Sequence, residues 1–202
     1  MRGEVIFDTP ALSSLKVDLP ELYARLSTRG ELREELREEL RRAYRALCSV
    51  ASPSFIGGEE ELEYRDGVPT LLGAPLDFNG AEKWLKGAKR VKLLTLSLGF
   101  GADRLICSPA SGVYSAFVAD ALASTLTEAL ADYAQDKLCE GERVGKRFSP
   151  GYGGVSLSLS RLIVAALGAD RRLGISFTEG GLMLPMKTVT AIIPVLEDAN
   201  AN

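Results

Sequence analysis

Apolar residues recur at helical spacing in the segment from residue 19 to residue 50, which begins with a Pro-Glu pair. The recurring positions are Leu32, Leu36, Leu40, Tyr44 and Leu47. Arg and Glu fill the other faces at offsets of three and four residues, where each pair contributes only a few tenths of a kcal/mol. The pattern predicts an amphipathic helix. Its charged face is expected to be solvated, and the alternative is a docking surface for another protein.

Shorter apolar pieces separated by Pro and Gly follow between residues 50 and 80. Two short strands are predicted around Asp66-Gly67, a typical hairpin turn, so we expect a small meander here. Residues 81–89 predict a short helix. The apolar run from Val91 to Leu98 predicts a buried strand that ends in a tight turn.

That turn, Gly99-Phe100-Gly101, invites comparison with the glycine-rich loop of dinucleotide-binding proteins. The fingerprint of that loop requires a third glycine three residues after the second, and Arg104 occupies this position. The sequence therefore disfavours a Rossmann-type nucleotide site.

The longest predicted helix covers residues 113–138, a stretch rich in Ala and Leu that contains neither Pro nor Gly. It is long enough for about seven turns, and Gly141 and Gly145 end it. A second helix is predicted from a cap at Ser156 to Leu167, with Gly168 suited to its end.

The last fifty residues predict a terminal hairpin. Apolar and β-branched residues surround Glu179-Gly180-Gly181, and the segment from Thr188 to Ile193 has the composition of a strand.

Composition excludes several kinds of chemistry. The chain has 202 residues, 24 Lys and Arg against 27 Asp and Glu, a net charge of −3, and no histidine. Without histidine the chain itself cannot provide a His-dependent catalytic triad, a His-ligated zinc or iron site, or a His ligand to a corrinoid. The slight acidity also argues against general binding to nucleic acid.

The same numbers indicate one globular domain over residues 1–202, because 46% of the residues are apolar. No apolar run approaches the roughly 20 residues that span a membrane, and the first ten residues lack the apolar region of a signal peptide, so we expect a cytoplasmic protein. Cys48, Cys107 and Cys139 are odd in number and far apart, which predicts reduced thiols and no metal site.

Two carboxylates lie four residues apart on the long helix. Glu128 and Asp132 are surrounded mainly by Ala, Leu, Thr and Tyr, and like charges at this spacing repel each other. Both side chains either point into water or form a negative site for an ammonium, a sulfonium or a metal. Asp132 is the candidate second carboxylate of such a site.

A lone arginine precedes a loop that contains one proline and three glycines, in the segment from Arg147 to Gly154. Glycine permits close approach of a ligand to the backbone, and the arginine fork suits a carboxylate or a phosphate. A plain structural turn is the alternative. Together with the carboxylates, the arginine would suit a ligand that carries both a cation and a carboxylate, such as an amino-acid moiety.

At these residues the chain resembles the activation domain of cobalamin-dependent methionine synthase, which binds S-adenosylmethionine. RFSPGY at Arg147 to Tyr152 matches the RxxxGY motif of that family. Three other blocks resemble the family in the same order, and they cover residues 95–106, 121–138 and 173–193. The resemblance extends over residues 75–195 and implies an α+β fold, with a twisted antiparallel sheet and flanking helices.

The resemblance also implies roles for individual residues. Arg147 corresponds to the arginine that binds the carboxylate of S-adenosylmethionine, and Glu128 to the glutamate that takes its amino group. Ser149 stands where the backbone contacts the ligand, while Gly151 and Tyr152 match the pair that shapes the pocket. After Gly151-Tyr152-Gly153 the small stand-alone relatives continue with Asp, then Pro, Leu and Gln. This chain has instead Gly154, Ser156, Leu157 and Ser160.

The function implied is that of an accessory component of a methyltransferase. Such a module supports the reductive methylation of cob(II)alamin, with S-adenosylmethionine as methyl donor, cobalamin held by a methionine synthase core, and a flavodoxin-like electron donor. Two alternatives remain: a non-catalytic docking module for a corrinoid protein, and a reactivation partner of another corrinoid methyltransferase.

Overall fold

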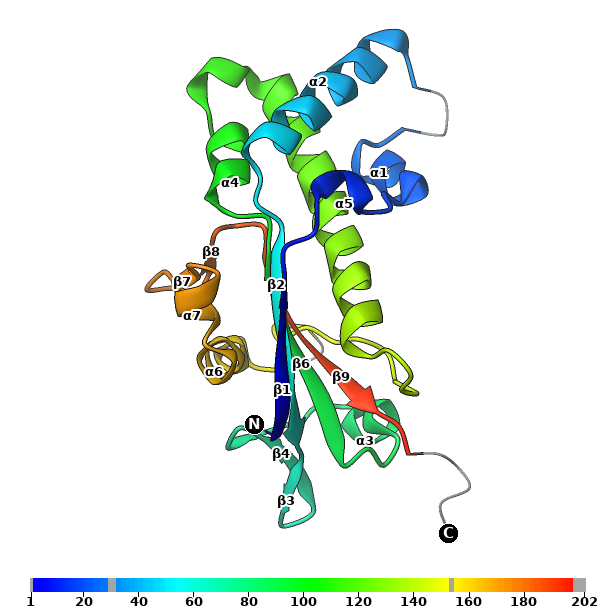
Figure 1. Cartoon of the computed structure of the whole chain (residues 1–202), viewed down its shortest axis with the longest axis vertical. Helices are drawn as coiled ribbons and strands as arrows, with labels where there is room; N and C mark the ends of the chain where they lie inside the picture. The colour runs from blue at the N-terminus through cyan, green and yellow to red at the C-terminus, as the bar shows by residue number, and fades with distance from the viewer. Residues whose placement is uncertain (1, 29–31, 153–154, 198–202) are drawn as a thin grey trace.

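The computed structural model describes residues 2–28, 32–152 and 155–197, and its frame is a twisted, four-stranded antiparallel sheet (Figure 1). The strand order is β1-β2-β6-β9. These strands comprise Arg2–Asp8 (β1), Ser54–Glu61 (β2), Arg90–Ser97 (β6) and Thr188–Val195 (β9). The mixed composition of helices and antiparallel sheet confirms the α+β fold.

Helices cover both faces of this sheet. Figure 1 shows it nearly edge-on, with α5 on one side and α6 and α7 on the other. Three helices share a core cluster with α5 (Val113–Leu138), namely α1 (Leu19–Arg25), α2 (Glu34–Val50) and α4 (Phe100–Ile106). The helices on the opposite face of the sheet are α6 (Ser158–Leu167) and α7 (Ala169–Arg172).

Side chains that alternate between the two faces of the sheet divide the hydrophobic core into two clusters. On β6, Leu94 and Leu96 pack in the same cluster as Leu126 of α5, whereas Leu93 packs in the cluster of Ile163 of α6. Successive side chains of a strand point to opposite faces, so a single strand supplies both clusters.

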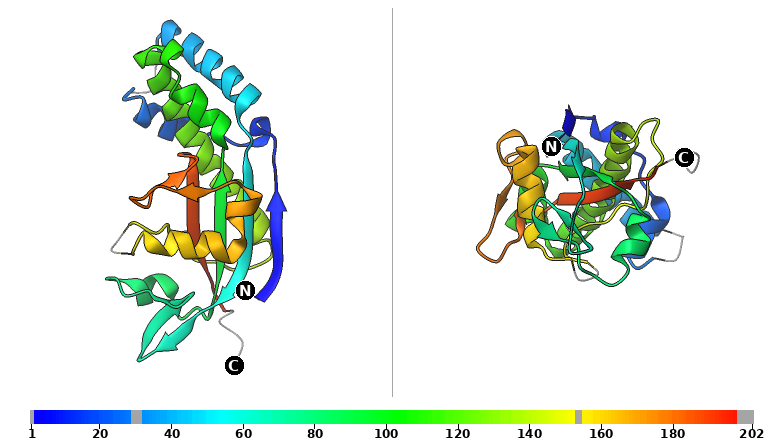
Figure 2. Two further views of the ribbon diagram at one scale, coloured as in Figure 1. Left: turned by 90° about the vertical axis from the view of Figure 1, so that its left-hand side faces the viewer. Right: turned by 90° about the horizontal axis from the view of Figure 1, so that it is seen from below.

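Smaller elements surround this frame (Figure 2). A three-stranded meander and a short helix lie at the lower end, a two-stranded hairpin lies beside α6, and two turns of 3-10 helix complete the chain. Their bounds are Glu63–Arg65 (β3), Val68–Leu71 (β4), Ala74–Pro75 (β5), Ala81–Leu85 (α3), Ser176–Phe177 (β7), Met183–Leu184 (β8), Leu12–Ser14 (η1) and Pro109–Ser111 (η2).

The amphipathic helix predicted within residues 19–50 is present as α2, with Leu36, Leu40 and Tyr44 packed against the core. Its predicted extent was wrong, because the structure has two helices there. The first ends at Arg25, followed by Leu26 as its cap and by Ser27 with a φ of 55°, a left-handed conformation that stops an α-helix. Residues 29–31, which the prediction also included, lie outside the described part of the chain.

Strand β2 was not predicted, because Gly57 and Gly58 interrupt its apolar pattern. In the structure a Cβ atom at Gly57 would lie 2.7 Å from Cδ2 of Leu138 on α5. Glycine in this strand therefore allows the long helix to approach the sheet closely.

Packing also explains the glycines after β6. Gly99 has a φ of 79° and caps α4, while a Cβ at Gly101 would lie 1.7 Å from the backbone oxygen of Val50. The sheet is antiparallel, so the dinucleotide-binding alternative does not apply.

Replacing Gly101 by alanine is therefore expected to destabilise the chain, although alanine is the better helix former. Helix propensity favours alanine by about 1 kcal/mol. Moving α4 away from α2 costs more, and we expect a net loss of about 1–3 kcal/mol in the free energy of unfolding, measured by urea denaturation. Gly180→Ala is the control, since its nearest neighbour would be 3.9 Å away, and equal losses in both variants would contradict this explanation.

An ion-pair network around the nearly buried Lys92 joins β2 and β6 to the turn that follows α5. Lys92 Nζ donates to Glu59 Oε2 at 2.8 Å and to Glu142 Oε1 at 3.0 Å, and Arg90 Nη1 donates to Glu59 Oε1 at 2.7 Å. Burial by itself raises the pKa of Glu59, but the hydrogen bonds and charges of Lys92 and Arg90 outweigh burial and hold this pKa below its ordinary 4.5. The ionised form is thus stabilised by folding.

Glu59→Gln is expected to lower the free energy of unfolding by about 1–3 kcal/mol at neutral pH, because it removes charge-assisted hydrogen bonds from a nearly buried ammonium. A depressed folded pKa gives stability that is present above pH 4.5 and lost as the pH falls through the folded value. Denaturation curves measured from neutral pH downward should therefore converge for wild type and variant in acid. Glu179→Gln, at an exposed hairpin tip, is the control; a difference that persists in acid would contradict the account.

The three cysteines are free, as predicted. Cys48 and Cys107 are exposed, while Cys139 is buried, and burial raises the pKa of its thiol to about 11. Among the described residues, no helix has the length and apolar character needed to cross a membrane.

Candidate functional site

The segment that carries Arg147 is held in place by β9, an edge strand of the four-stranded sheet. The N–H of Gly145 donates to Pro194 O at 2.8 Å, and Phe148 and Ile192 exchange two backbone hydrogen bonds of 2.9 and 2.8 Å. The segment therefore continues the sheet beyond its fourth strand, although only isolated bridges form.

Phe148 fixes this segment from one face. Its ring stacks on Phe78 with centroids 5.2 Å apart and lies 5.3 Å from the ring of Trp84. The indole N–H of Trp84 also donates to Lys146 O at 2.7 Å. Because neighbouring residues of an extended segment point to opposite faces, Arg147 projects toward α5.

Arg147 meets three acceptors on α5. Its Nη1 donates to Asp132 Oδ1 at 3.0 Å and to Gln135 Oε1 at 3.1 Å, and its Nη2 donates to Glu128 Oε2 at 3.3 Å. The side chain of Arg147 is 19% exposed, against 44% for Glu128 and 74% for Asp132. The charged residues singled out in the sequence are thus brought together.

This arrangement resolves the repulsion expected between Glu128 and Asp132. One guanidinium bridges the two carboxylates, which leaves the group with one net negative charge. The carboxylates remain open to solvent while the cation is mostly covered. Such a group can bind a ligand that brings its own cation and its own carboxylate.

The loop after Arg147 turns at the predicted glycine. Ser149 is half-buried, Gly151 has a φ of 96°, and the Gly151 N–H donates to Val155 O at 2.9 Å. The Tyr152 side chain is 72% exposed, and within the described residues no hydrogen bond or ring contact joins it to Arg147 or Glu128. Gly153 and Gly154 lie outside the described residues.

Gln135 is a site residue that sequence reasoning missed. It lies three residues after Asp132 and seven after Glu128, so helical periodicity places it on the same face of α5. That spacing was the available signal, but a neutral amide did not stand out. The neighbouring Tyr133 also links α5 to the sheet, since its hydroxyl donates to Asp8 Oδ2 at 2.9 Å.

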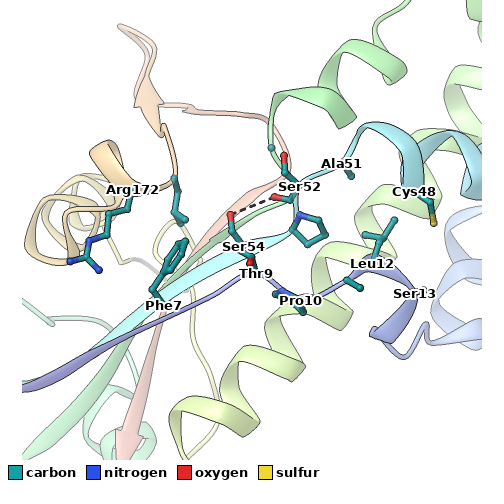
Figure 3. A pocket seen from close by; sticks show the side chains of 14 residues that line it. Phe7, Thr9, Pro10, Leu12, Ser13, Cys48, Ala51, Ser52, Ser54 and Arg172 are labelled. Atoms are coloured by element: carbon teal, nitrogen blue, oxygen red, sulfur yellow. Dashed lines mark hydrogen bonds between the residues drawn. The ribbon is translucent and has the colours of Figure 1, made fainter.

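A separate pocket of about 550 Å³ lies where the chain leaves β1 and enters β2 (Figure 3). Phe7, Pro10 and Leu12 line it together with the hydroxyls of Thr9 and Ser54, and Arg172 is its one charged side chain. It includes none of the residues around Arg147. Opposite charges converge at Arg147 and not in this pocket, so we assign the candidate site to Arg147.

The fold is of the methionine synthase reactivation-domain type. A solved structure described as the MetH reactivation domain bound to AdoHcy superposes with a TM-score of 0.68 and 17% sequence identity. The match covers 100% of this chain and 81% of that one. It confirms the fold that the sequence resemblance implied. No family model and no curated protein matches the sequence.

Proposed function

We propose that this chain is an S-adenosylmethionine-binding reactivation module, which supports reductive methylation of cob(II)alamin on a cobalamin-dependent methionine synthase. One observation carries the proposal: Arg147 lies against Glu128 and Asp132 on α5, within a fold similar to a reactivation domain that binds AdoHcy. AdoHcy is the product that S-adenosylmethionine becomes when it loses its methyl group.

Each residue has a defined role in this proposal. Arg147 binds the ligand's carboxylate, and Glu128 accepts from its ammonium group. The backbone at Ser149 and the turn at Gly151 border the ligand, and the exposed ring of Tyr152 covers it. Catalysis by the chain is then a matter of orientation, because a bound sulfonium methyl group is presented to its acceptor in a fixed position.

The proposed reaction balances when an external donor supplies one electron to the cobalt. A flavodoxin-like donor reduces cob(II)alamin to cob(I)alamin. The cobalt electron pair then forms the cobalt–carbon bond with the methyl group, and the breaking sulfur–carbon pair returns to sulfur, giving S-adenosylhomocysteine. No proton is transferred, so no general base is needed, which agrees with a chain that has no histidine.

Cobalamin is assigned to the partner in this scheme. The chain contains no imidazole that could serve as a lower axial ligand to cobalt. In a complex with histidine ligation, that ligand must therefore belong to the cobalamin-bearing protein.

Calorimetric titration of S-adenosylmethionine into the purified chain tests ligand binding. We expect one site with a dissociation constant in the micromolar range, equivalent to about 8 kcal/mol of binding free energy. A folded chain that gives no saturable heat would contradict the proposal.

A non-catalytic docking module for a corrinoid protein is the second candidate. It is favoured by one observation, that Arg147 already has three acceptors within its own chain. Co-purification with a corrinoid protein in the absence of S-adenosylmethionine binding would support this candidate over the first.

A further inference from the structure

The guanidinium of Arg147 is held at one nitrogen and open at the opposite edge. Nη1 has two hydrogens, and both have acceptors, Asp132 Oδ1 at 3.0 Å and Gln135 Oε1 at 3.1 Å. Nη2 donates only to Glu128, at the longer distance of 3.3 Å, and Nε has no acceptor among the described residues. One edge of the fork is therefore anchored while the edge formed by Nε and Nη2 keeps donors to spare.

We propose that Gln135 and Asp132 are positioning residues that fix Nη1 of Arg147 and thereby present its Nε and Nη2 edge to the carboxylate of the ligand. The inference rests on the proposed function, because it concerns how the same site recognises S-adenosylmethionine. A carboxylate binds most strongly to two parallel N–H groups of a guanidinium, and the Nε and Nη2 pair has this geometry.

Glu128 is the exchangeable member of the group. Its bond to Nη2 is the longest of the three, and the ligand's carboxylate replaces it there. The released Glu128 then accepts from the ligand's ammonium group, so every charge has a partner again. A ligand with a carboxylate alone would displace Glu128 without offering it a new cation, so the site favours an amino-acid moiety.

Gln135 suits the anchoring role because it is neutral. It supplies an acceptor to Nη1 without adding a third negative charge to Glu128 and Asp132. It is also only partly exposed, whereas Asp132 is 74% exposed and is screened by water. The amide is thus expected to orient the guanidinium more firmly than the exposed carboxylate does.

The test compares two ligands on the full chain. S-adenosylmethionine carries the amino-acid moiety, and 5′-methylthioadenosine lacks it. Gln135→Met keeps the length of the side chain but removes the acceptor, and we expect about a 5–10-fold loss of affinity for S-adenosylmethionine with no change for 5′-methylthioadenosine. Gln135→Glu restores an acceptor and should recover affinity relative to Gln135→Met. Asp170→Asn, at an exposed position of α7 on the other face of the sheet, is the control.

The outcomes separate this inference from the function on which it rests. Wild-type affinity in Gln135→Met, or equal losses for both ligands, would overturn the positioning role while leaving the proposed function intact. Absence of S-adenosylmethionine binding in wild type would overturn both. A folded Gln135→Met variant, shown by an unchanged circular dichroism spectrum and melting temperature, excludes general unfolding as the cause of any loss.

Discussion

Replacing Arg147 by alanine is expected to weaken binding of S-adenosylmethionine by at least about 100-fold, equivalent to about 2.7 kcal/mol. The substitution removes the only cation in contact with Glu128 and Asp132 among the described residues, and with it the donor pair for the ligand's carboxylate. Charge-assisted, bidentate hydrogen bonds are among the strongest that a binding site offers. Calorimetric titration of wild type and variant measures the loss.

The fold should survive this change. Both carboxylates are at least 44% exposed, so water can solvate them once Arg147 is gone, and we expect the stability to change by less than about 1 kcal/mol. Arg172→Ala is the matched control, since Arg172 is an exposed arginine in a separate pocket. Equal affinities in wild type and Arg147→Ala would remove Arg147 from the binding site.

Phe148→Ala is expected to have the largest effect on stability, a loss of about 2–4 kcal/mol in the free energy of unfolding. The ring packs against Phe78 and Trp84, and its backbone pairs with Ile192. Loss of the ring leaves a cavity beneath the segment that carries Arg147, so ligand affinity should fall as well. Urea denaturation and calorimetry on the same preparation measure the two effects.

An exposed aromatic residue provides the control for this variant. Phe117 on α5 is 48% exposed, and Phe117→Ala should change the stability by less than about 0.5 kcal/mol. If Phe148→Ala lost no more stability than Phe117→Ala, the aromatic cluster would not be what fixes the loop. If it lost stability but bound S-adenosylmethionine as wild type does, the cluster would not position Arg147.

Local patterns in the sequence predicted the elements that depend on local interactions. The bounds of α5 agree with the prediction because Ala and Leu favour a helix and no Pro or Gly interrupts these 26 residues. The end of α6 was also predicted, and Gly168 adopts the left-handed conformation that ends a helix. The predicted hairpin at Asp66-Gly67 is present between β3 and β4, because this turn also depends on local sequence.

Elements that depend on distant partners were not predictable in this way. The glycines of β2 suggest a loop in the sequence. Their role in the strand is to make room for Leu138 of α5, which packs over Gly57. At the site, the charges of Glu128, Asp132 and Arg147 stand out in the sequence, and the family resemblance linked them. The hydrogen bond between Gln135 and Arg147 and the pairing of Phe148 with Ile192 depend on the way in which the loop runs along β9.

The most direct test of the account is methyl transfer to the partner protein. A cobalamin-bearing methionine synthase core in the cob(II)alamin state is incubated with an electron donor, methyl-labelled S-adenosylmethionine and this chain. The account predicts labelled methylcobalamin on the partner with wild type, and at least about a 100-fold lower rate with Arg147→Ala at subsaturating S-adenosylmethionine. Wild-type chain that binds both S-adenosylmethionine and the partner but transfers no label would contradict it.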